Sequence, residues 1–359
     1  MTFASRWPTK KLMAVEKKLR RHRDFWDRTN REPLLGFTIG DYFVSRRFRA
    51  ASQILATKDP IGPEMLRVDE FREDYLRMHE ETESVEQDIF FTGTPFTGIP
   101  WMEAMLGCEV YATGHSFVAQ GPGGQAEGLS PEARFCQPWL DRYLEFTRML
   151  TEVGEGRFPV GQPIMRGPTD IVGTLLGQER LVYEIYDHPD EVRRLLRESA
   201  EIFLAVIREQ KRLIDGFHGG SSMGFYDLWC PGDSIWYQDD LNALLSPEIY
   251  DEIVYPVHRM IPKDYEYSLF HLHPASFFIL DSLLTIEDLK VVQINKDEGG
   301  PSVAEMMPVF RKVQEKKNLA LWGSFSPEEV TLISEQLPPE GVYVMVAIET
   351  PQESVNYLR

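Results

Sequence analysis

The sequence predicts a single α/β barrel, a closed (β/α)8 or TIM barrel, preceded by a helical extension at residues 1–32. From about residue 155 onward, short β-rich runs alternate with helical stretches, which is the pattern of parallel βα units. About eight strands can be counted, and no Gly/Ser linker, low-complexity tract or repeat divides residues 1–359. Parallel strands without a domain break favour a closed barrel over an open sheet.

The expected strands are β-branched or aromatic runs that end in a turn or at the start of a helix. In chain order they are Glu32–Ile39, Asp88–Phe91, Phe158–Ile164, Ser234–Asp239, Tyr267–His271, Lys290–Ile294, Asn318–Trp322 and Val342–Ile348. Helix starts are predicted at Ser246-Pro247-Glu248, Ser326-Pro327-Glu328-Glu329 and Thr350-Pro351-Gln352-Glu353, where a capping hydroxyl precedes proline. Further helices are expected over Val68–Glu86 and from His188-Pro189-Asp190 to Glu209.

Composition and charge limit the class of protein. Of the 359 residues 43% are hydrophobic and 26% charged, which is ordinary for a globular chain, and the net charge of −18 argues against a nucleic-acid partner. Residues 1–32 differ, because their ten Lys/Arg and four Asp/Glu give +6. This segment could dock an acidic partner or the protein's own acidic body, or simply form a solvated amphipathic helix.

Location is predicted from what the chain lacks. Cys108, Cys136 and Cys230 form neither an even disulfide set nor a CxxC pair, which fits a reducing compartment. No apolar run approaches the ~20 residues that span a bilayer, and the N-terminus lacks the apolar core of a signal peptide. A cytoplasmic protein without a membrane partner is therefore expected.

The strongest chemical signal is His271-Leu272-His273 at the end of an expected strand. Side chains two residues apart on a strand point the same way, so the two imidazoles can converge on one metal ion or substrate. The alternative is two partly buried histidines that form hydrogen bonds with neighbouring carbonyls. Glu349 ends the last strand on the same rim and could complete a His/His/Glu set of the kind that holds catalytic zinc. Equally, it could only favour the dipole of the following helix.

A second candidate region is Trp236-Tyr237-Gln238-Asp239-Asp240, where another strand ends. Carboxylates beside aromatic residues at a barrel rim can orient a substrate, transfer a proton or supply an oxygen ligand. Gln238 and Asp240 alternate onto one face, and one of the two aspartates can be merely solvated. The preceding aromatic stretch, Phe225 to Gly232 with Trp229, suits a pocket wall or lid, although core packing would explain it equally well.

Two familiar site types are excluded by spacing. No GxGxxG or P-loop motif follows a strand, since Gly121-Pro122-Gly123-Gly124 lacks the lysine and the helix start, and no GxSxG elbow exists.

Taken together, the chain resembles the uroporphyrinogen decarboxylase-like superfamily, and within it the corrinoid-dependent methyltransferase branch. The likeness runs from about residue 90 to the C-terminus and rests on the order and spacing of its motifs. These are Pro95 to Cys108 with Leu106-Gly107-Cys108-Glu109, Arg166-Gly167-Pro168-Thr169-Asp170, Tyr186-Asp187-His188-Pro189-Asp190, Leu245-Ser246-Pro247-Glu248 with Tyr250 and Pro256, and the histidine segment at 271–273.

The resemblance implies a (β/α)8 barrel and a metal position. Members that transfer methyl groups to or from thiols hold zinc with His-x-Cys at this strand end and a Cys near the last strand. The corresponding residues here are His271, His273 and Glu349, without a thiolate. Imidazole and carboxylate leave zinc a harder Lewis acid suited to oxygen, which shifts the expectation from thiol methylation to demethylation.

The resemblance also bears on porphyrinogen decarboxylation. True uroporphyrinogen decarboxylases carry an early Arg-containing strand-end motif that grips substrate carboxylates. The first strand here, from Leu35 to Tyr42, lacks it, and Arg46, Arg47 and Arg49 beyond it are expected to be helical. Porphyrinogen decarboxylation is accordingly disfavoured.

The function expected is a methyltransferase that demethylates a small donor, a methoxylated aromatic or else a methylamine, and passes the methyl group to the cobalt of a corrinoid (cobalamin) protein. Zinc would bind to His271, His273 and Glu349. Catalytic roles are assigned to Asp240, Gln238 and Asp239, and substrate binding to Tyr237, Trp236, Trp229 and Trp322. The alternatives are a metal-free decarboxylase or lyase and a non-catalytic ligand-binding barrel. The oligomeric state stays open.

Overall fold

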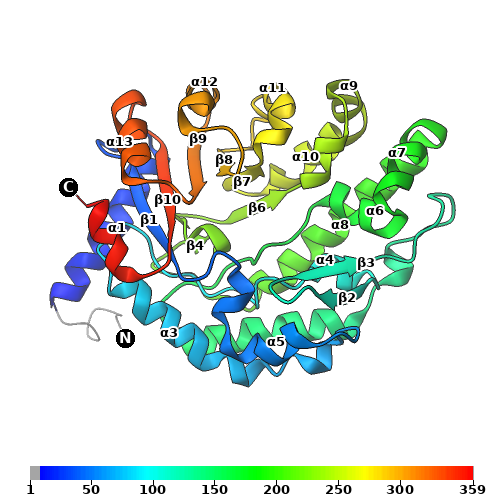
Figure 1. Cartoon of the computed structure of the whole chain (residues 1–359), viewed down its shortest axis with the longest axis horizontal. Coiled ribbons are helices and arrows are strands. Elements are labelled where there is room, and N and C mark those ends of the chain that lie inside the picture. Colours follow the sequence, from blue (N-terminus) through cyan, green and yellow to red (C-terminus); the bar gives the residue numbers. More distant parts are fainter. Residues whose placement is uncertain (1–8, 359) are drawn as a thin grey trace.

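The computed structural model describes residues 9–358, and its centre is a curved six-stranded parallel sheet (Figure 1). The strand order is β1-β10-β9-β8-β7-β6. The strands are β1 (Leu34–Ile39), β6 (Ser234–Gln238), β7 (Tyr267–Leu272), β8 (Val291–Lys296), β9 (Asn318–Gly323) and β10 (Val342–Ile348). These six strands were all expected from sequence, and their ends differ from the expected ones by at most two residues. Such a sheet is compatible with a TIM-like barrel.

The register brings the ends of the strands to one rim. Gln238 on β6 pairs with His271 on β7, which in turn pairs with Gln293 on β8. Since all six strands are parallel, their carboxyl ends and the loops after them share one side of the molecule.

Two expected strands, Asp88–Phe91 and Phe158–Ile164, are not strands, and this corrects the sequence-based count of eight. Both segments are irregular, and between them the described residues form a single parallel bridge, Gly93 to Val160. In Phe158–Ile164 the physical reason is donor loss, because Pro159 and Pro163 have no N–H to contribute to a ladder. Next to Asp88–Phe91, the N–H groups of Leu35 and Phe37 on β1 bond to the side chains of Asp88 and Gln87 instead of to a strand backbone. The row of strands is therefore not closed by regular pairing between β1 and β6.

Helices surround this sheet. Figure 1 shows α10, α11, α12 and α13 outside the curved row of strands, and α3 and α5 on the opposite side of the molecule. The longer helices are α1 (Thr9–Trp26), α3 (Arg72–Glu83), α5 (Gln137–Gly154), α6 (Pro168–Leu176), α7 (Gln178–Asp187), α8 (Pro189–Lys211), α12 (Val303–Gln314) and α13 (Pro327–Gln336). The shorter ones are α2 (Ser52–Ala56), α4 (Trp101–Met105), α9 (Pro247–Ile249), α10 (Tyr255–Met260) and α11 (Leu280–Leu283).

Capping residues start the helices where the sequence predicts. Ser326 and Thr350 each form a capping box, with Glu329 and Glu353 bonding back to the cap. Ser246 accepts a hydrogen bond from the N–H of Ile249 at the start of α9. Two antiparallel hairpins were not predicted from sequence: β2 (Glu109–Ala112) with β3 (Phe117–Gln120), and β4 (Ser221–Ser222) with β5 (Trp229–Cys230).

The basic N-terminal segment packs on the protein's own body, which was one of the sequence-based alternatives. Within α1, Arg21 forms an ion pair with Asp88 at 2.8 Å and Lys18 one with Glu83 at 3.4 Å. The indole N–H of Trp26 donates to the carbonyl of Trp229. Residues 1–8 lie outside the described part of the chain. None of the described helices has the length and apolar character needed to cross a membrane.

Candidate functional site

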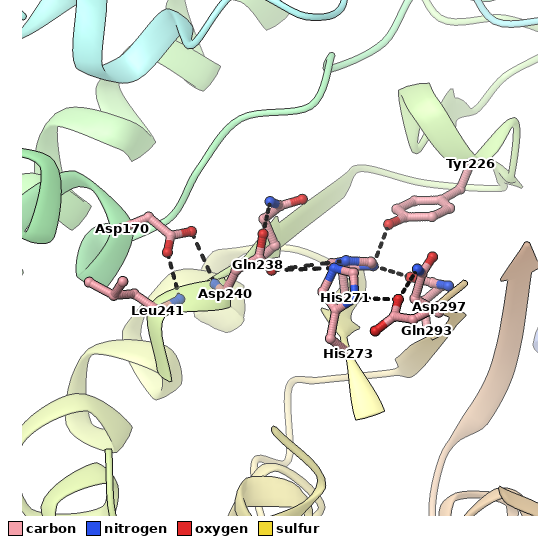
Figure 2. A network of polar contacts seen from close by, with 10 residues as sticks. Asp170, Tyr226, Gln238, Asp240, Leu241, His271, His273, Gln293 and Asp297 are labelled. Atoms are coloured by element: carbon pink, nitrogen blue, oxygen red, sulfur yellow. Dashed lines mark hydrogen bonds and ion pairs between the residues drawn. The ribbon is translucent and has the colours of Figure 1, made fainter. Parts of the chain in front are cut away.

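The most concentrated chemistry of the described residues lies where β6 and β7 end. Asp240, His271 and His273 each offer a ligand atom, and these atoms all lie within 4.8 Å of one another. The Nε2 atoms of His271 and His273 are 4.0 and 3.8 Å from Oδ1 of Asp240. Figure 2 shows the two imidazoles turned toward this carboxylate. A metal ion bound by all three would sit at the end of parallel strands, where barrel enzymes carry their chemistry.

The far nitrogen of each imidazole is held in place by an acceptor. Nδ1 of His271 contacts the side-chain oxygen of Gln293, and Nδ1 of His273 lies 2.7 Å from Oδ1 of Asp297. The Asp297 carboxylate only accepts, so Nδ1 of His273 carries the proton and its Nε2 presents a lone pair. Nδ1 of His271 also lies 2.8 Å from the hydroxyl of Tyr226. When this Nδ1 carries the proton, both Gln293 and Tyr226 can accept from it, and Nε2 of His271 presents its lone pair as well. Metal-binding histidines are held in this way, because the outer acceptor fixes the tautomer and the ring orientation.

The environment keeps the two imidazoles electronically different. Burial lowers the pKa of His271, more than the carboxylate of Asp240 raises it, which favours the neutral ring that a metal requires. Burial also acts to lower the pKa of His273, but the hydrogen bond to Asp297 and the charge of Asp240 raise it overall. A proton would therefore compete with a metal ion more strongly at His273 than at His271.

A cavity of about 260 Å³ opens over this group. His271 lines it with a buried side chain, whereas the side chain of Asp240 is 44% exposed. The cavity is walled by aromatic residues from several loops and strand ends, namely Tyr42, Phe43, His115, Phe225, Tyr226 and Trp322. Apolar walls with a few convergent polar groups are typical of a site for a small organic ligand.

Asp240 is positioned by a reciprocal pair of aspartates. The side chain of Asp239 accepts from the N–H groups of Thr169 and Asp170 at the start of α6, at 2.9 and 3.1 Å. The side chain of Asp170 accepts in turn from the N–H groups of Asp240 and Leu241, at 3.1 and 2.7 Å (Figure 2). Each carboxylate caps the segment that carries the other, so the backbone of Asp240 is fixed from two sides.

Glycine is required where these two segments meet. A Cβ at Gly167 would lie 2.0 Å from the carbonyl oxygen of Gln238, so a larger residue would separate α6 from β6. The stretch from Arg166 to Asp170, which carries part of the family resemblance, thus helps to hold Asp240 in place.

Strand alternation separates the other residues of β6 that the sequence singled out. Gln238 lines the cavity and donates to Oδ2 of Asp240 at 3.0 Å. Tyr237 and Asp239 point to the other face, toward the helices. The Tyr237 hydroxyl donates to the carbonyl of His258, and Asp239 lies 2.7 Å from Nε2 of His258 with both side chains fully buried. Asp239 and Tyr237 therefore position the rim and do not line the cavity.

Of the tryptophans expected to bind substrate, Trp322 lines the cavity and packs on Phe225 with ring centroids 5.5 Å apart. Trp236 is completely buried deeper in the interior, where its indole donates to the carbonyl of Gln162. Trp229 packs against α1 beside His22. Neither Trp236 nor Trp229 reaches this cavity, because β6 and β5 present them below the rim.

Glu349 does not join the group of potential ligands, and Asp240 stands in its place. The strand order explains this, because β10 is separated from β7 by β8 and β9. Three strand spacings amount to roughly 14 Å, too far for one ion to bridge. The side chain of Glu349 is exposed, and the backbone N–H of Glu349 bonds to Glu353 in the following turn.

Sequence reasoning missed the residues that support the imidazoles. Asp297 follows β8 directly, so a carboxylate just beyond a strand end was a signal that could have identified it. Gln293 lies inside β8 and Tyr226 in a short turn before β5, and neither position carries a pattern of its own. Both are recognisable only once the strand order places them beside His271.

No protein-family model matches the chain, and no curated protein matches it. Solved structures do match: a methyltransferase from Methanosarcina mazei superposes with a TM-score of 0.62 at 16% identity. The match covers 95% of this chain and 96% of that one. At this identity the likeness shows a shared fold over nearly the whole length of both chains.

Proposed function

We propose that this protein is a methyltransferase that removes the methyl group of a methoxylated aromatic compound and passes it to the cobalt of a corrinoid protein. The observation that carries the proposal is the convergence of Asp240 and the Nε2 atoms of His271 and His273 under an aromatic cavity. We further propose that the fold is a (β/α)8 barrel in which residues 88–97 and 158–166 replace two regular strands. The methyltransferase activity named for the structural neighbour supports the proposal.

The donor set fits zinc and suits oxygen chemistry. Two neutral imidazoles and one carboxylate leave zinc with one positive charge, whereas thiolates would neutralise it. When bound, such an ion supplies a Lewis acid that draws electron density from the ether oxygen of the donor. The Nδ1 bonds to Gln293 and Asp297 keep both lone pairs aimed at one point.

The other residues of the cavity bind and orient the donor. Trp322 and Phe225 offer faces on which an aromatic ring packs, and their rings are tilted by 56° to one another. Gln238 occupies Oδ2 of Asp240, so Oδ1 stays directed at the imidazoles. In the transfer the carbon–oxygen bond would break with both electrons left on the aromatic oxygen, which would take up a proton from solvent. The electron pair of the new bond to the methyl group would come from the cobalt(I) of the corrinoid partner. The methyl group leaves toward the open mouth, where a corrinoid partner must approach.

Methyl transfer to free cob(I)alamin tests this function. Zinc-loaded protein should convert at least one member of a panel of methoxyaromatics to the phenol, and His271→Ala should abolish both metal retention and transfer. His188→Ala, which removes an exposed histidine at the start of α8, is the matched control and should retain both. A wild type that stays metal-free after zinc loading would contradict the Lewis-acid mechanism. Transfer from no donor, methylamines included, would contradict the function.

A further inference from the structure

The cavity of about 260 Å³ over Asp240, His271 and His273 is here called the metal cavity. Among the described residues that line it or the small cavity beside it, Arg47 is the one arginine or lysine. It ends the turn Val44–Arg47 that follows β1. Its Nε donates to the carbonyl of Asp41 at 2.6 Å, while its Nη2 is buried without a hydrogen-bond partner. No carboxylate of the described residues forms an ion pair with it. A buried guanidinium with an unused donor is costly, and such a group commonly marks a ligand position.

The small cavity that Arg47 lines, here called the side cavity, measures about 70 Å³. Its other polar groups include Thr92, Thr94 and Asp227. Asp227 already accepts from the N–H of Thr92 at 2.7 Å, and burial raises its pKa to about 8. Near neutral pH most Asp227 is therefore protonated. It can then donate a hydrogen bond. The charges of Asp41 and Glu81 still act on Arg47 from a distance, but neither carboxylate forms an ion pair with it.

The side cavity adjoins the metal cavity. Val44, Thr97 and Phe225 line both of them, so the two cavities lie side by side, and a ligand that spans both would have to pass between these three side chains. The volumes of the two cavities indicate which end of such a ligand each of them could hold. A cavity of ~150 Å³ accommodates benzene. The metal cavity exceeds this volume and the side cavity has less than half of it, which is room for a carboxylate but not for a ring.

We propose that the side cavity binds a carboxylate of the methyl donor, so that Arg47 selects methoxylated aromatic carboxylic acids. The proposal rests on the function proposed above. The ring lies in the metal cavity against the side chains of Phe225 and Trp322, with the methoxy oxygen toward His271 and His273. The carboxylate accepts from Nη2 of Arg47 and from the protonated Asp227. Arg47 is thereby a binding residue that sets specificity, at the end of the ligand away from the reacting bond.

A matched pair of donors tests this on the unaltered protein. para-Methoxybenzoate and para-methoxybenzamide have nearly the same shape and differ in charge. The zinc-loaded protein should bind the benzoate at least ~10-fold more tightly in calorimetric titration, because the amide has no negative charge to pair with the guanidinium. Equal binding, or tighter binding of the amide, would overturn the proposal.

Arginine variants test the residue itself. Arg47→Gln should weaken benzoate binding by ~10-fold or more and leave benzamide binding nearly unchanged. Arg46→Gln is the control, since it removes the neighbouring charge from a side chain that is 52% exposed, and should change neither. Circular dichroism and thermal unfolding establish that both variants are folded. If Arg47→Gln is not, Arg47→Lys should keep the preference for the acid while binding it more weakly.

The remaining outcomes separate this proposal from the function on which it rests. Transfer from no donor contradicts the methyltransferase function, yet binding of the benzoate that depends on Arg47 would still support the carboxylate site. Efficient transfer from the benzamide with no preference for the acid supports the function and overturns the carboxylate site. Binding of phosphate or chloride that depends on Arg47, with no benzoate binding, would show a site for free anions and overturn the proposal as well.

Discussion

Two adjacent aspartates, Asp239 and Asp240, each lie beside histidine, and the structure gives them opposite surroundings. Asp239 and His258 are fully buried, and the Asp239 carboxylate has donors on both oxygens. Asp240 is 44% exposed and faces two imidazoles whose Nε2 atoms form no hydrogen bond within the described chain. Aspartate and histidine thus form a buried, fully hydrogen-bonded pair on one side of β6. On the other side they form a partly exposed group whose Nε2 atoms are free to bind a ligand.

What separates the two pairs is hydrogen-bond satisfaction. A buried carboxylate whose acceptors are all occupied has nothing left to offer a substrate, and its loss disturbs the fold. A carboxylate that is fixed through its backbone but has a free oxygen can bind a ligand at little cost to the fold. Mutation of Asp239 should therefore lower mainly the stability of the protein, and mutation of Asp240 mainly its activity.

The largest expected effect is on stability. Asp239→Ala leaves the first N–H groups of α6 and the imidazole of His258 without their acceptor in a buried region. We expect the free energy of unfolding to fall by ~3–5 kcal/mol, measured by urea denaturation. Asp240→Ala should cost under ~1 kcal/mol, since its side chain lies partly in solvent. Equal losses from the two substitutions would remove the distinction.

Next in size is the effect on metal binding. Asp240→Ala removes one of three ligand groups, and we expect zinc affinity and methyl transfer to drop by ~100-fold or more with the fold intact. Competition with a chromogenic chelator measures the affinity. Asp59→Ala, at an exposed site, serves as the control and should leave both quantities unchanged. Undiminished zinc affinity in Asp240→Ala would exclude this carboxylate as a ligand.

A smaller effect is expected from the residue behind His273. Asp297→Asn keeps the shape but removes the charged acceptor of the Nδ1 proton, which is 2.7 Å away. Loss of such an outer partner typically lowers metal affinity by ~10–100-fold, and the same chelator competition detects it. Glu298→Gln, which changes the adjacent carboxylate, provides the comparison. The assignment of Asp297 would be wrong if both variants retained full affinity.

The sequence alone predicted where these groups lie better than which of them meet. Period-2 patterns and capping residues located six strands, so His271, His273, Gln238 and Asp240 were correctly placed at strand ends. Contact between strand ends depends on strand order, which no local pattern encodes. Glu349 could meet the two histidines only if β10 lay beside β7. In the structure β7 instead lies next to β6, which leads to Asp240, and two strands separate it from β10. Asp239 and Asp240 were likewise indistinguishable until the surroundings of each carboxylate were known.

The segment Phe158–Ile164, which was expected to be a strand, also shows what a local pattern cannot predict. Phe158–Ile164 has the composition of a strand, but its prolines leave backbone groups unpaired, and the gap is spanned partly by side chains. Nε2 of Gln162 donates to the carbonyl of Trp236, and the indole of Trp236 donates to the carbonyl of Gln162. Such side-chain bridges replace a ladder at one place and cannot be deduced from composition.

A third buried carboxylate, Asp227, sharpens the comparison through pH. Unlike Asp239, it has no imidazole partner, and burial raises its pKa from 3.8 to about 8. Between these two values the folded state holds a proton that the unfolded state has released, so stability must fall as pH rises. We expect the slope of the unfolding free energy to approach ~1.4 kcal/mol per pH unit from this residue alone. Denaturant titrations of the wild type and Asp227→Asn from pH 5 to 8 isolate it, since the variant loses this contribution. Parallel pH profiles for the two proteins would mean that Asp227 is charged in the fold, and Arg47 would then have its counter-ion.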